Sequence, residues 1–184
     1  AIADIDGDDW PDFYLTQFSP KQLLYRNLGG GLFEEVAGMW GLDLGTLNSA
    51  GGATSGATFV DFDDDGDPDL FMLKMGKNRV YRNDGTTFTR IDDALGLEGE
   101  EDENSNSIAF GDMDGDMDLD AWITNASEYF EPGQEFTDGP DRLFRNDGNG
   151  FTDISEIIPL ENRHGEGFVS GWSDFDQDGD LDVY

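Results

Sequence analysis

Short apolar segments recur along the chain, and glycine or aspartate bounds each of them. Three of them read FYLTQF from Phe13, LFMLKM from Leu70 and AWIT from Ala121. Brief runs of aromatic and β-branched residues with such boundaries are typical of β-strands. No heptad pattern of a long helix is present. The pattern therefore predicts an all-β chain.

A second pattern follows three of these segments and predicts a β-hairpin. It reads LLYRNLGGGLFEEV from Leu23, RVYRNDGTTFTRI from Arg79 and RLFRNDGNGFTDI from Arg142. Asn, Asp and Gly stand where the turn needs a left-handed backbone. Each unit then reads as strand, acidic loop, strand, link, strand, turn and strand. Four antiparallel strands in such a repeat are typical of a β-propeller blade.

The acidic loop is a nonapeptide that occurs four times. It reads DIDGDDWPD from Asp4, DFDDDGDPD from Asp61, DMDGDMDLD from Asp112 and DFDQDGDLD from Asp174. We call these segments the Asp loops and number their residues 1 to 9. They divide the chain into repeats at approximately 1–57, 58–108, 109–170 and a truncated 171–184. About three blades plus an overhang are too few to close a propeller, so we expect part of a larger one of roughly six to eight blades.

Charge excludes several classes of partner. The chain has 42 acidic against 10 basic residues and a formal net charge of −32, which argues against binding to nucleic acid or anionic lipid. It has no cysteine and one histidine, so disulfides and Cys/His zinc sites are excluded. No apolar run is long enough for membrane insertion. The 14 Phe, 5 Tyr and 4 Trp are too many core-forming side chains for a disordered acidic tail.

The Asp loops have the composition of calcium sites. Clustered carboxylates repel each other by about 1 kcal/mol per close pair in water, and a hard divalent cation removes that cost. Calcium accepts oxygen ligands in flexible geometry. We predict one calcium per loop, up to four, held by side chains at positions 1, 3, 5 and 9 and the backbone carbonyl at position 7. The predicted ligands are Asp4, Asp6, Asp8, Trp10 and Asp12; Asp61, Asp63, Asp65, Asp67 and Asp69; Asp112, Asp114, Asp116, Asp118 and Asp120; and Asp174, Asp176, Asp178, Asp180 and Asp182.

The residue at position 6 differs among the four loops. Gly66 and Gly179 supply a left-handed turn there, whereas Asp9 and Met117 stand at the same position in the other two. A left-handed methionine costs about 1–2 kcal/mol, so the third loop is expected to bend differently or to bind calcium more weakly. An EF-hand needs Glu at position 12, and those positions hold Leu15, Met72 and Ile123. The alternative is a solvated acidic face without a cation.

The Asp-x-Asp-x-Asp-Gly-x-x-Asp loop followed by Tyr-Arg-Asn-x-Gly resembles FG-GAP/VCBS-type repeats. The strings are similar to those of UnbV and cartilage acidic protein, and the loops to those of the integrin α-subunit propeller. The resemblance covers essentially the whole chain. It implies a calcium-binding β-propeller in which the Asp loop joins the first two strands of a blade.

Other residues have weaker signals. Arg26, Arg82 and Arg145 recur in the hairpin pattern, which favours a repeated structural contact. The four tryptophans, Trp10, Trp40, Trp122 and Trp172, favour core or inter-blade packing, with glycan stacking as the alternative. His164 is a catalytic candidate without a nearby nucleophile, and Asn125-Ala126-Ser127 is a glycosylation sequon in an inserted loop.

Three functions are compatible with these observations. The first is an extracellular, cell-surface or periplasmic adhesion module that binds a protein or glycan ligand, with structural calcium and no enzymatic activity. The second is a polysaccharide lyase or hydrolase on a propeller scaffold. The third is a structural repeat that packs against neighbouring subunits or blades of a surface or filament assembly.

Overall fold

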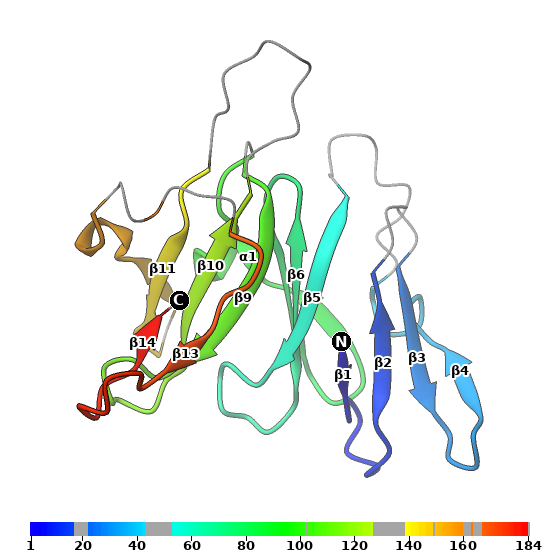
Figure 1. Ribbon diagram of the computed structural model, residues 1–184. Coiled ribbons are helices and arrows are strands. Elements are labelled where there is room, and N and C mark those ends of the chain that lie inside the picture. Colours follow the sequence, from blue (N-terminus) through cyan, green and yellow to red (C-terminus); the bar gives the residue numbers. More distant parts are fainter. Residues whose placement is uncertain are drawn as a thin grey trace.

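The computed structural model describes residues 1–16, 22–42, 53–101, 103–126, 139–148, 150–159, 163 and 167–183. These residues form three four-stranded antiparallel sheets and one two-stranded sheet (Figure 1). Blade 1 contains β1 (Ile2–Ala3), β2 (Asp12–Leu15), β3 (Leu23–Asn27) and β4 (Phe33–Glu35). Blade 2 contains β5 (Thr54–Val60), β6 (Asp69–Lys74), β7 (Arg79–Asn83) and β8 (Phe88–Arg90). Blade 3 contains β9 (Ser105–Gly111), β10 (Asp120–Asn125), β11 (Arg142–Asn146) and β12 (Phe151–Asp153), and β13 (Trp172–Ser173) pairs with β14 (Asp182–Val183).

The order of the strands confirms the predicted all-β repeat. In each four-stranded sheet, every strand pairs with its neighbour in sequence. The register also repeats, because Phe13 pairs with Tyr25 in blade 1 and Leu70 pairs with Tyr81 in blade 2. The predicted repeat boundaries at 57/58 and 108/109 fall inside β5 and β9, so each sheet begins a few residues before them.

The hydrophobic cores lie between successive sheets. The central strand β6 is buried along its whole length, because both of its faces are covered. Leu70 and Met72 pack toward blade 1, and the alternate residues Phe71 and Leu73 pack toward blade 3. The first core contains Tyr14, Leu24, Leu70, Met72, Tyr81 and Phe88, among others, and the second contains Phe71, Leu73, Val80, Ala121, Ile123, Phe144 and Phe151. Sheets that bury both faces explain why these strands read as continuous apolar runs.

Hairpin asparagines join each blade to the one before it. The side-chain amide of Asn83 donates to the carbonyl oxygen of Ile5 at 2.9 Å, across the boundary between blades 2 and 1. Asn146 donates in the same way to the carbonyl of Phe62 at 3.5 Å, between blades 3 and 2. Ile5 and Phe62 both occupy position 2 of an Asp loop. The hairpin of one blade therefore holds the Asp loop of the preceding blade.

The links that leave blades 1 and 2 pack against the outer strand of the following blade. Gly41 and Gly96 have φ values of 79° and 77°. A Cβ on Gly41 would lie 2.6 Å from the carbonyl oxygen of Phe88, and one on Gly96 would lie 3.0 Å from that of Phe151. The N–H of Phe88 also donates to the carbonyl of Trp40 at 2.8 Å. Glycine is required at these two positions by both conformation and space.

Two short helical segments, α1 (Asp92–Leu95) and η1 (Ser155–Ile157), follow the last strands of blades 2 and 3, where no helix was predicted. Among the described residues, no helix has the length and apolar character needed to cross a membrane. The acidic segment that begins at Glu98 leads into β9, which starts at Ser105. Cross-strand hydrogen bonds hold this start in place, because the Ser105 hydroxyl accepts from Asn78 and donates to Asn125.

The sequon asparagine lies on a buried strand, although the sequence predicted an inserted loop. Asn125 is the last residue of β10 rather than part of an exposed loop, and its side chain is fully buried. Its amide nitrogen donates to the carbonyl of Pro140 at 2.7 Å, and its amide oxygen accepts from the Ser105 hydroxyl at 2.9 Å. Both polar atoms are engaged, so the side chain is not available for glycosylation. Residues 127–138 of the insertion and His164 lie outside the described residues.

Candidate metal centres in the Asp loops

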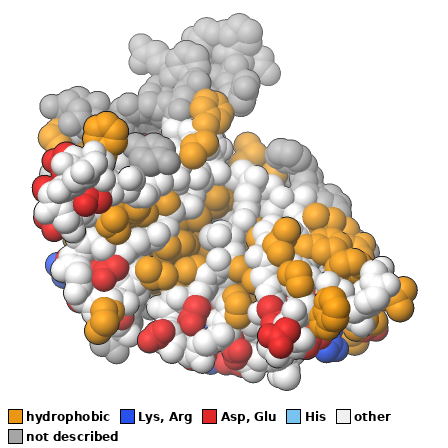
Figure 2. All heavy atoms as spheres, turned by 60° about the horizontal axis from the view of Figure 1, so that its bottom comes forward, with side chains coloured by type: hydrophobic (Ala, Val, Ile, Leu, Met, Phe, Trp, Pro, Cys, Tyr) orange, Lys and Arg blue, Asp and Glu red, His pale blue; other side chains and the backbone are white. Residues whose placement is uncertain are grey.

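All four Asp loops join the first and second strands of their sheets and lie at one end of the molecule, the lower end in Figure 1. Figure 2 brings that end forward and shows acidic side chains gathered over it in separate patches. The carboxylates are thus divided among four sites along the row of sheets.

The aspartate at position 1 organises each loop. In the second loop, the Asp61 carboxylate accepts the N–H of Asp65 at 3.2 Å and that of Gly66 at 3.0 Å. The same residue accepts both bonds in the first and third loops and the bond from position 6 in the fourth. The position-5 aspartate then accepts the N–H of position 7, as Asp65 does from Asp67 at 2.9 Å. These local bonds curl the backbone so that several carboxylates face one point.

Two positions in each loop have a left-handed backbone. Position 6 has φ values of 67° at Asp9, 93° at Gly66, 80° at Met117 and 101° at Gly179. Position 4 is also left-handed, with 69° at Gly7, 56° at Asp64, 78° at Gly115 and 62° at Gln177. Every loop has one glycine at one of the two positions. The left-handed backbone at position 4 was not predicted, although the glycines at that position in the first and third loops were the available signal.

Met117→Gly should stabilise the third loop. The loop does not bend differently around Met117, which has a φ of 80° and is 87% exposed. The strain is already present without a bound ion, so it acts on the stability of the fold, and a glycine would relieve it and lose little packing. After subtracting the entropy of glycine in the unfolded chain, we expect a gain of about 1 kcal/mol in the free energy of unfolding. Urea unfolding measures it. The matched control Met39→Gly, also at an exposed methionine, should give no gain, and a loss in Met117→Gly would contradict the interpretation.

The aspartate at position 9 connects its loop to the hairpin of the same blade. Asp120 accepts the N–H of Met113 in its loop at 2.7 Å and the N–H of Asn146 in the hairpin at 2.8 Å. Asp12 and Asp69 make the same pair of bonds in blades 1 and 2. The side chains of Asp12, Asp69 and Asp120 are fully buried. This second, structural role of position 9 was not visible in the sequence.

Burial makes these carboxyl groups hold protons more tightly. Burial raises the pKa of Asp69 to about 7, and the nearby Asp63 and Asp65 carboxylates add to the rise. The N–H groups of Asn83 and Phe62 act in the opposite direction. Burial likewise raises the pKa of Asp12, Asp63 and Asp120. A cation that neutralises the loop would favour the ionised form.

Without calcium, the free energy of unfolding should fall as pH rises from about 5 to about 8. Folded Asp69, with its pKa of about 7, retains a proton that the unfolded chain releases near 3.8, so its protonation favours folding below pH 7 and is lost above it. Urea unfolding in chelator across this range tests the slope. Asp69→Asn should flatten it, and so should saturating calcium. If the free energy of unfolding falls with pH as steeply in Asp69→Asn and in saturating calcium as in the wild type in chelator, the prediction is wrong.

Three carboxylates converge in every loop. Their oxygens lie within 4.8 Å of one another in four groups: Asp4, Asp6 and Asp8; Asp61, Asp63 and Asp69; Asp112, Asp114 and Asp120; and Asp174, Asp176 and Asp182. The second, third and fourth groups use positions 1, 3 and 9, whereas the first uses positions 1, 3 and 5. The position-5 residues Asp65, Asp116 and Asp178 lie outside the groups of their loops, as does Asp12 in the first loop.

The side chain at position 7 turns away from this centre. A Cβ on the hairpin residue Gly85 would lie 3.2 Å from Asp67 Oδ2, and one on Gly148 would lie 3.1 Å from Asp118 Oδ2. In blade 1 the Trp10 indole occupies the same place, 3.4 Å from a Cβ on Gly29. Position 7 can therefore offer a cation its backbone carbonyl rather than its side chain. Asp180 holds this position in the fourth loop, where its N–H donates to Asp178.

The donor set fits a hard divalent cation. Each of the four groups brings together three carboxylate oxygens and no nitrogen or sulfur donor. The Asp6 side chain is 9% exposed, and its Oδ1 atom is buried without a hydrogen-bond partner. Oxygen-only sites of this kind suit calcium, magnesium or manganese rather than metals that prefer nitrogen or sulfur.

The tryptophans divide between packing and exposure. Trp40 and Trp122 are buried, and Trp40 lies with its ring centre 5.8 Å from that of Phe88 in the next blade. Trp172 on β13 donates from its indole nitrogen to the carbonyl of Ala109 in blade 3. These three follow the packing prediction. Trp10 is 50% exposed.

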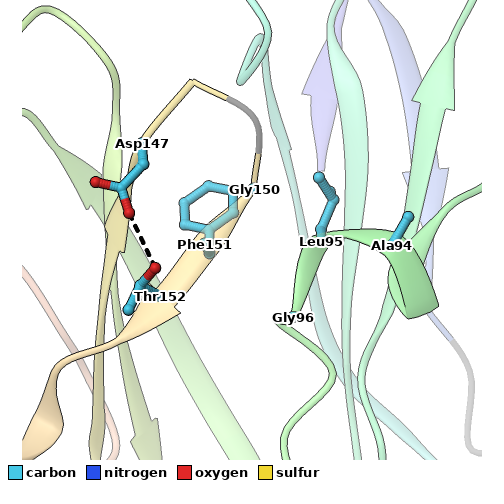
Figure 3. A pocket seen from close by; sticks show the side chains of 7 residues that line it. All are labelled: Ala94, Leu95, Gly96, Asp147, Gly150, Phe151 and Thr152. Atoms are coloured by element: carbon cyan, nitrogen blue, oxygen red, sulfur yellow. Dashed lines mark hydrogen bonds between the residues drawn. The ribbon is translucent and has the colours of Figure 1, made fainter.

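A shallow groove lies between blades 2 and 3 at the Asp-loop end. In Figure 3, Ala94 and Leu95 of α1 face the β11–β12 hairpin across it, with Phe151 between them. The groove continues to Asp63 and Arg82 beside the second Asp loop. Thr152 donates to Asp147 at 2.9 Å along its wall.

Taken together, the sheets and loops define an all-β repeat module of propeller-like blades with acidic loops at one end. A family model described as an FG-GAP-like repeat matches residues 4–72 and again residues 61–123. The two matches together cover more than half of the chain, so the protein belongs to the FG-GAP-like repeat family. The chain matches none of the curated proteins compared with it.

Proposed function

We propose that the protein is a calcium-stabilised β-propeller module that works outside the cytoplasm and binds a protein or glycan ligand without catalysing a reaction. The observation that carries this proposal is the convergence of three carboxylates in each of four loops at one end of the sheets. In the second to fourth loops, positions 1, 3 and 9 would hold the ion, with the carbonyl of position 7. In the first loop, Asp4, Asp6 and Asp8 would hold it.

The residues of this chain explain why a bound ion would stabilise the blades. Position 1 curls the loop, and position 9 fastens it to the hairpin of the same blade. The hairpin asparagine then reaches the Asp loop of the preceding blade. Calcium would remove the repulsion among the carboxylates, and this chain of contacts would pass that stabilisation from blade to blade. Extracellular modules bind calcium with dissociation constants of about 10⁻⁴–10⁻³ M, which suits millimolar calcium outside cells.

The groove between α1 and β12 is the surface of the described residues that supports a ligand-binding role. It lies at the same end as the Asp loops, and its lining joins apolar residues to the charged residues Asp63 and Arg82. The test is a glycan array probed with the protein in calcium and in chelator, followed by product analysis of every retained glycan. Calcium-dependent retention without turnover is expected. Depolymerisation of a retained polysaccharide would overturn the non-enzymatic assignment.

We also propose that blade 1 packs against a further blade of the same kind. Phe33 is 45% exposed, whereas its register equivalents Phe88 and Phe151 are 4% and 9% exposed between blades. Phe33 packs beside Phe13 with the rings tilted and 5.0 Å between their centres, on a face with no described neighbour. Figure 2 shows hydrophobic side chains gathered at this side of the molecule. An intact mass of the native protein well above 20.3 kDa is expected, and a 20.3 kDa monomer would contradict it.

A further inference from the structure

The arginine of the hairpin has the same register in all three blades but not the same partner. Arg82 donates from Nε to Asp84 Oδ1 at 3.0 Å, and Arg145 donates to Asp147 Oδ1 at 2.9 Å. In both cases the partner is the aspartate two residues later in the turn. That aspartate also accepts the hydroxyl of a threonine on the last strand, which fixes its orientation.

Blade 1 lacks this aspartate. Leu28 stands in its place and is 50% exposed. Arg26 instead reaches the first Asp loop, where Nε forms an ion pair with Asp6 Oδ2 and Nη2 lies 3.4 Å from Asp8 Oδ2. Asp6 and Asp8 are two of the three carboxylates that converge in that loop. The guanidinium therefore lies against the candidate metal ligands of blade 1.

The arrangement of the first loop differs accordingly. Its converging carboxylates come from positions 1, 3 and 5, whereas the other three loops use positions 1, 3 and 9. The Asp6 side chain is nine-tenths buried, and its Oδ1 atom has no hydrogen-bond partner. A cation that binds this atom must either displace Arg26 or remain beside its positive charge. Both alternatives lower the affinity of the loop for a cation.

We propose that Arg26 is a built-in counter-ion of the first Asp loop, and that this loop binds a divalent cation more weakly than the other three. The proposal rests on the calcium role proposed above and adds an order to the sites. The first loop is partly neutralised without metal, so blade 1 depends less on calcium. A partly buried ion pair of this kind should weaken binding by roughly three- to tenfold.

The test is a calcium titration of chelator-treated protein in an isothermal titration calorimeter. The wild type should show one site about three- to tenfold weaker than the rest, and Asp4→Ala should remove that weak site. Leu28→Asp gives Arg26 the partner that Arg82 and Arg145 have. It should raise the calcium association constant of the weak site toward those of the other sites. Leu32→Asp adds the same charge at a 65% exposed position of the same turn and is the matched control.

The reciprocal substitution tests the same interaction in blade 2, where it does not depend on the folding of blade 1. Asp84→Leu should release Arg82 toward the second loop and create an additional weak site. Equal constants at all sites, or a Leu28→Asp effect no larger than that of Leu32→Asp, would overturn this proposal and leave the calcium role standing. Absence of calcium binding at every loop would overturn both.

Discussion

Replacing Asp120 by alanine should destabilise the protein by about 3 kcal/mol or more in calcium and still by about 2 kcal/mol in chelator. The buried carboxylate accepts the N–H groups of Met113 and Asn146, and both would lose their acceptor. Each buried, unsatisfied polar group costs about 1–3 kcal/mol. Relief from burying a carboxylate, whose pKa is raised by that burial, offsets part of the loss in chelator. Urea unfolding of the variant and the wild type under both conditions gives the two differences.

The matched control is Asp112→Ala in the same loop. The Asp112 carboxylate also converges on the candidate metal centre, but its N–H donors are exposed and can bond to water instead. Its replacement should therefore matter chiefly when calcium is present. If Asp112→Ala were as harmful as Asp120→Ala in chelator, the structural role assigned to position 9 would be wrong.

The free energy of unfolding should be about 2–6 kcal/mol lower in chelator than in millimolar calcium. The figure follows from mass action, with about 0.4–1.4 kcal/mol for each site at dissociation constants of about 10⁻⁴–10⁻³ M. For a chain of this length, the midpoint of thermal unfolding should fall by roughly 5–20 °C. Differential scanning calorimetry in calcium and in chelator measures the shift.

Magnesium provides the control for this second prediction. Magnesium demands strict octahedral geometry and keeps several waters, so the same concentration should restore little of the lost stability. A midpoint that does not respond to chelator would contradict the stabilising role of the ion. Full recovery in magnesium would show that the loops respond to divalent charge alone.

Much of the fold was predictable because its determinants are local. Strands such as β6 are short apolar runs bounded by Asp and Gly, and the Asn-Asp-Gly turn fixes the β7–β8 hairpin. The Asp loops were located because glycine and alternating carboxylates mark them directly. Repetition then strengthened each local signal, since the same order of elements returned in every unit.

The features that the sequence did not reveal depend on contacts between distant residues. Asn83 bonds Ile5, which is 78 residues away, and no local pattern encodes that pairing. Arg26 and Arg82 share the Tyr-Arg-Asn triplet, but Leu28 stands where Asp84 follows Arg82, and only the fold shows that Arg26 reaches Asp6 instead. Asn125 matched a glycosylation sequon, but it lies at the end of a buried strand, where its side chain is not available for glycosylation.

The most direct measurement is the number of calcium ions bound per chain, by equilibrium dialysis of chelator-treated protein with metal analysis. Saturation is expected near four ions for each chain, one in each group of converging carboxylates, with loss of one ion in the variant Asp61→Ala. Retention of no calcium at millimolar concentration, or an unchanged number in that variant, would contradict it.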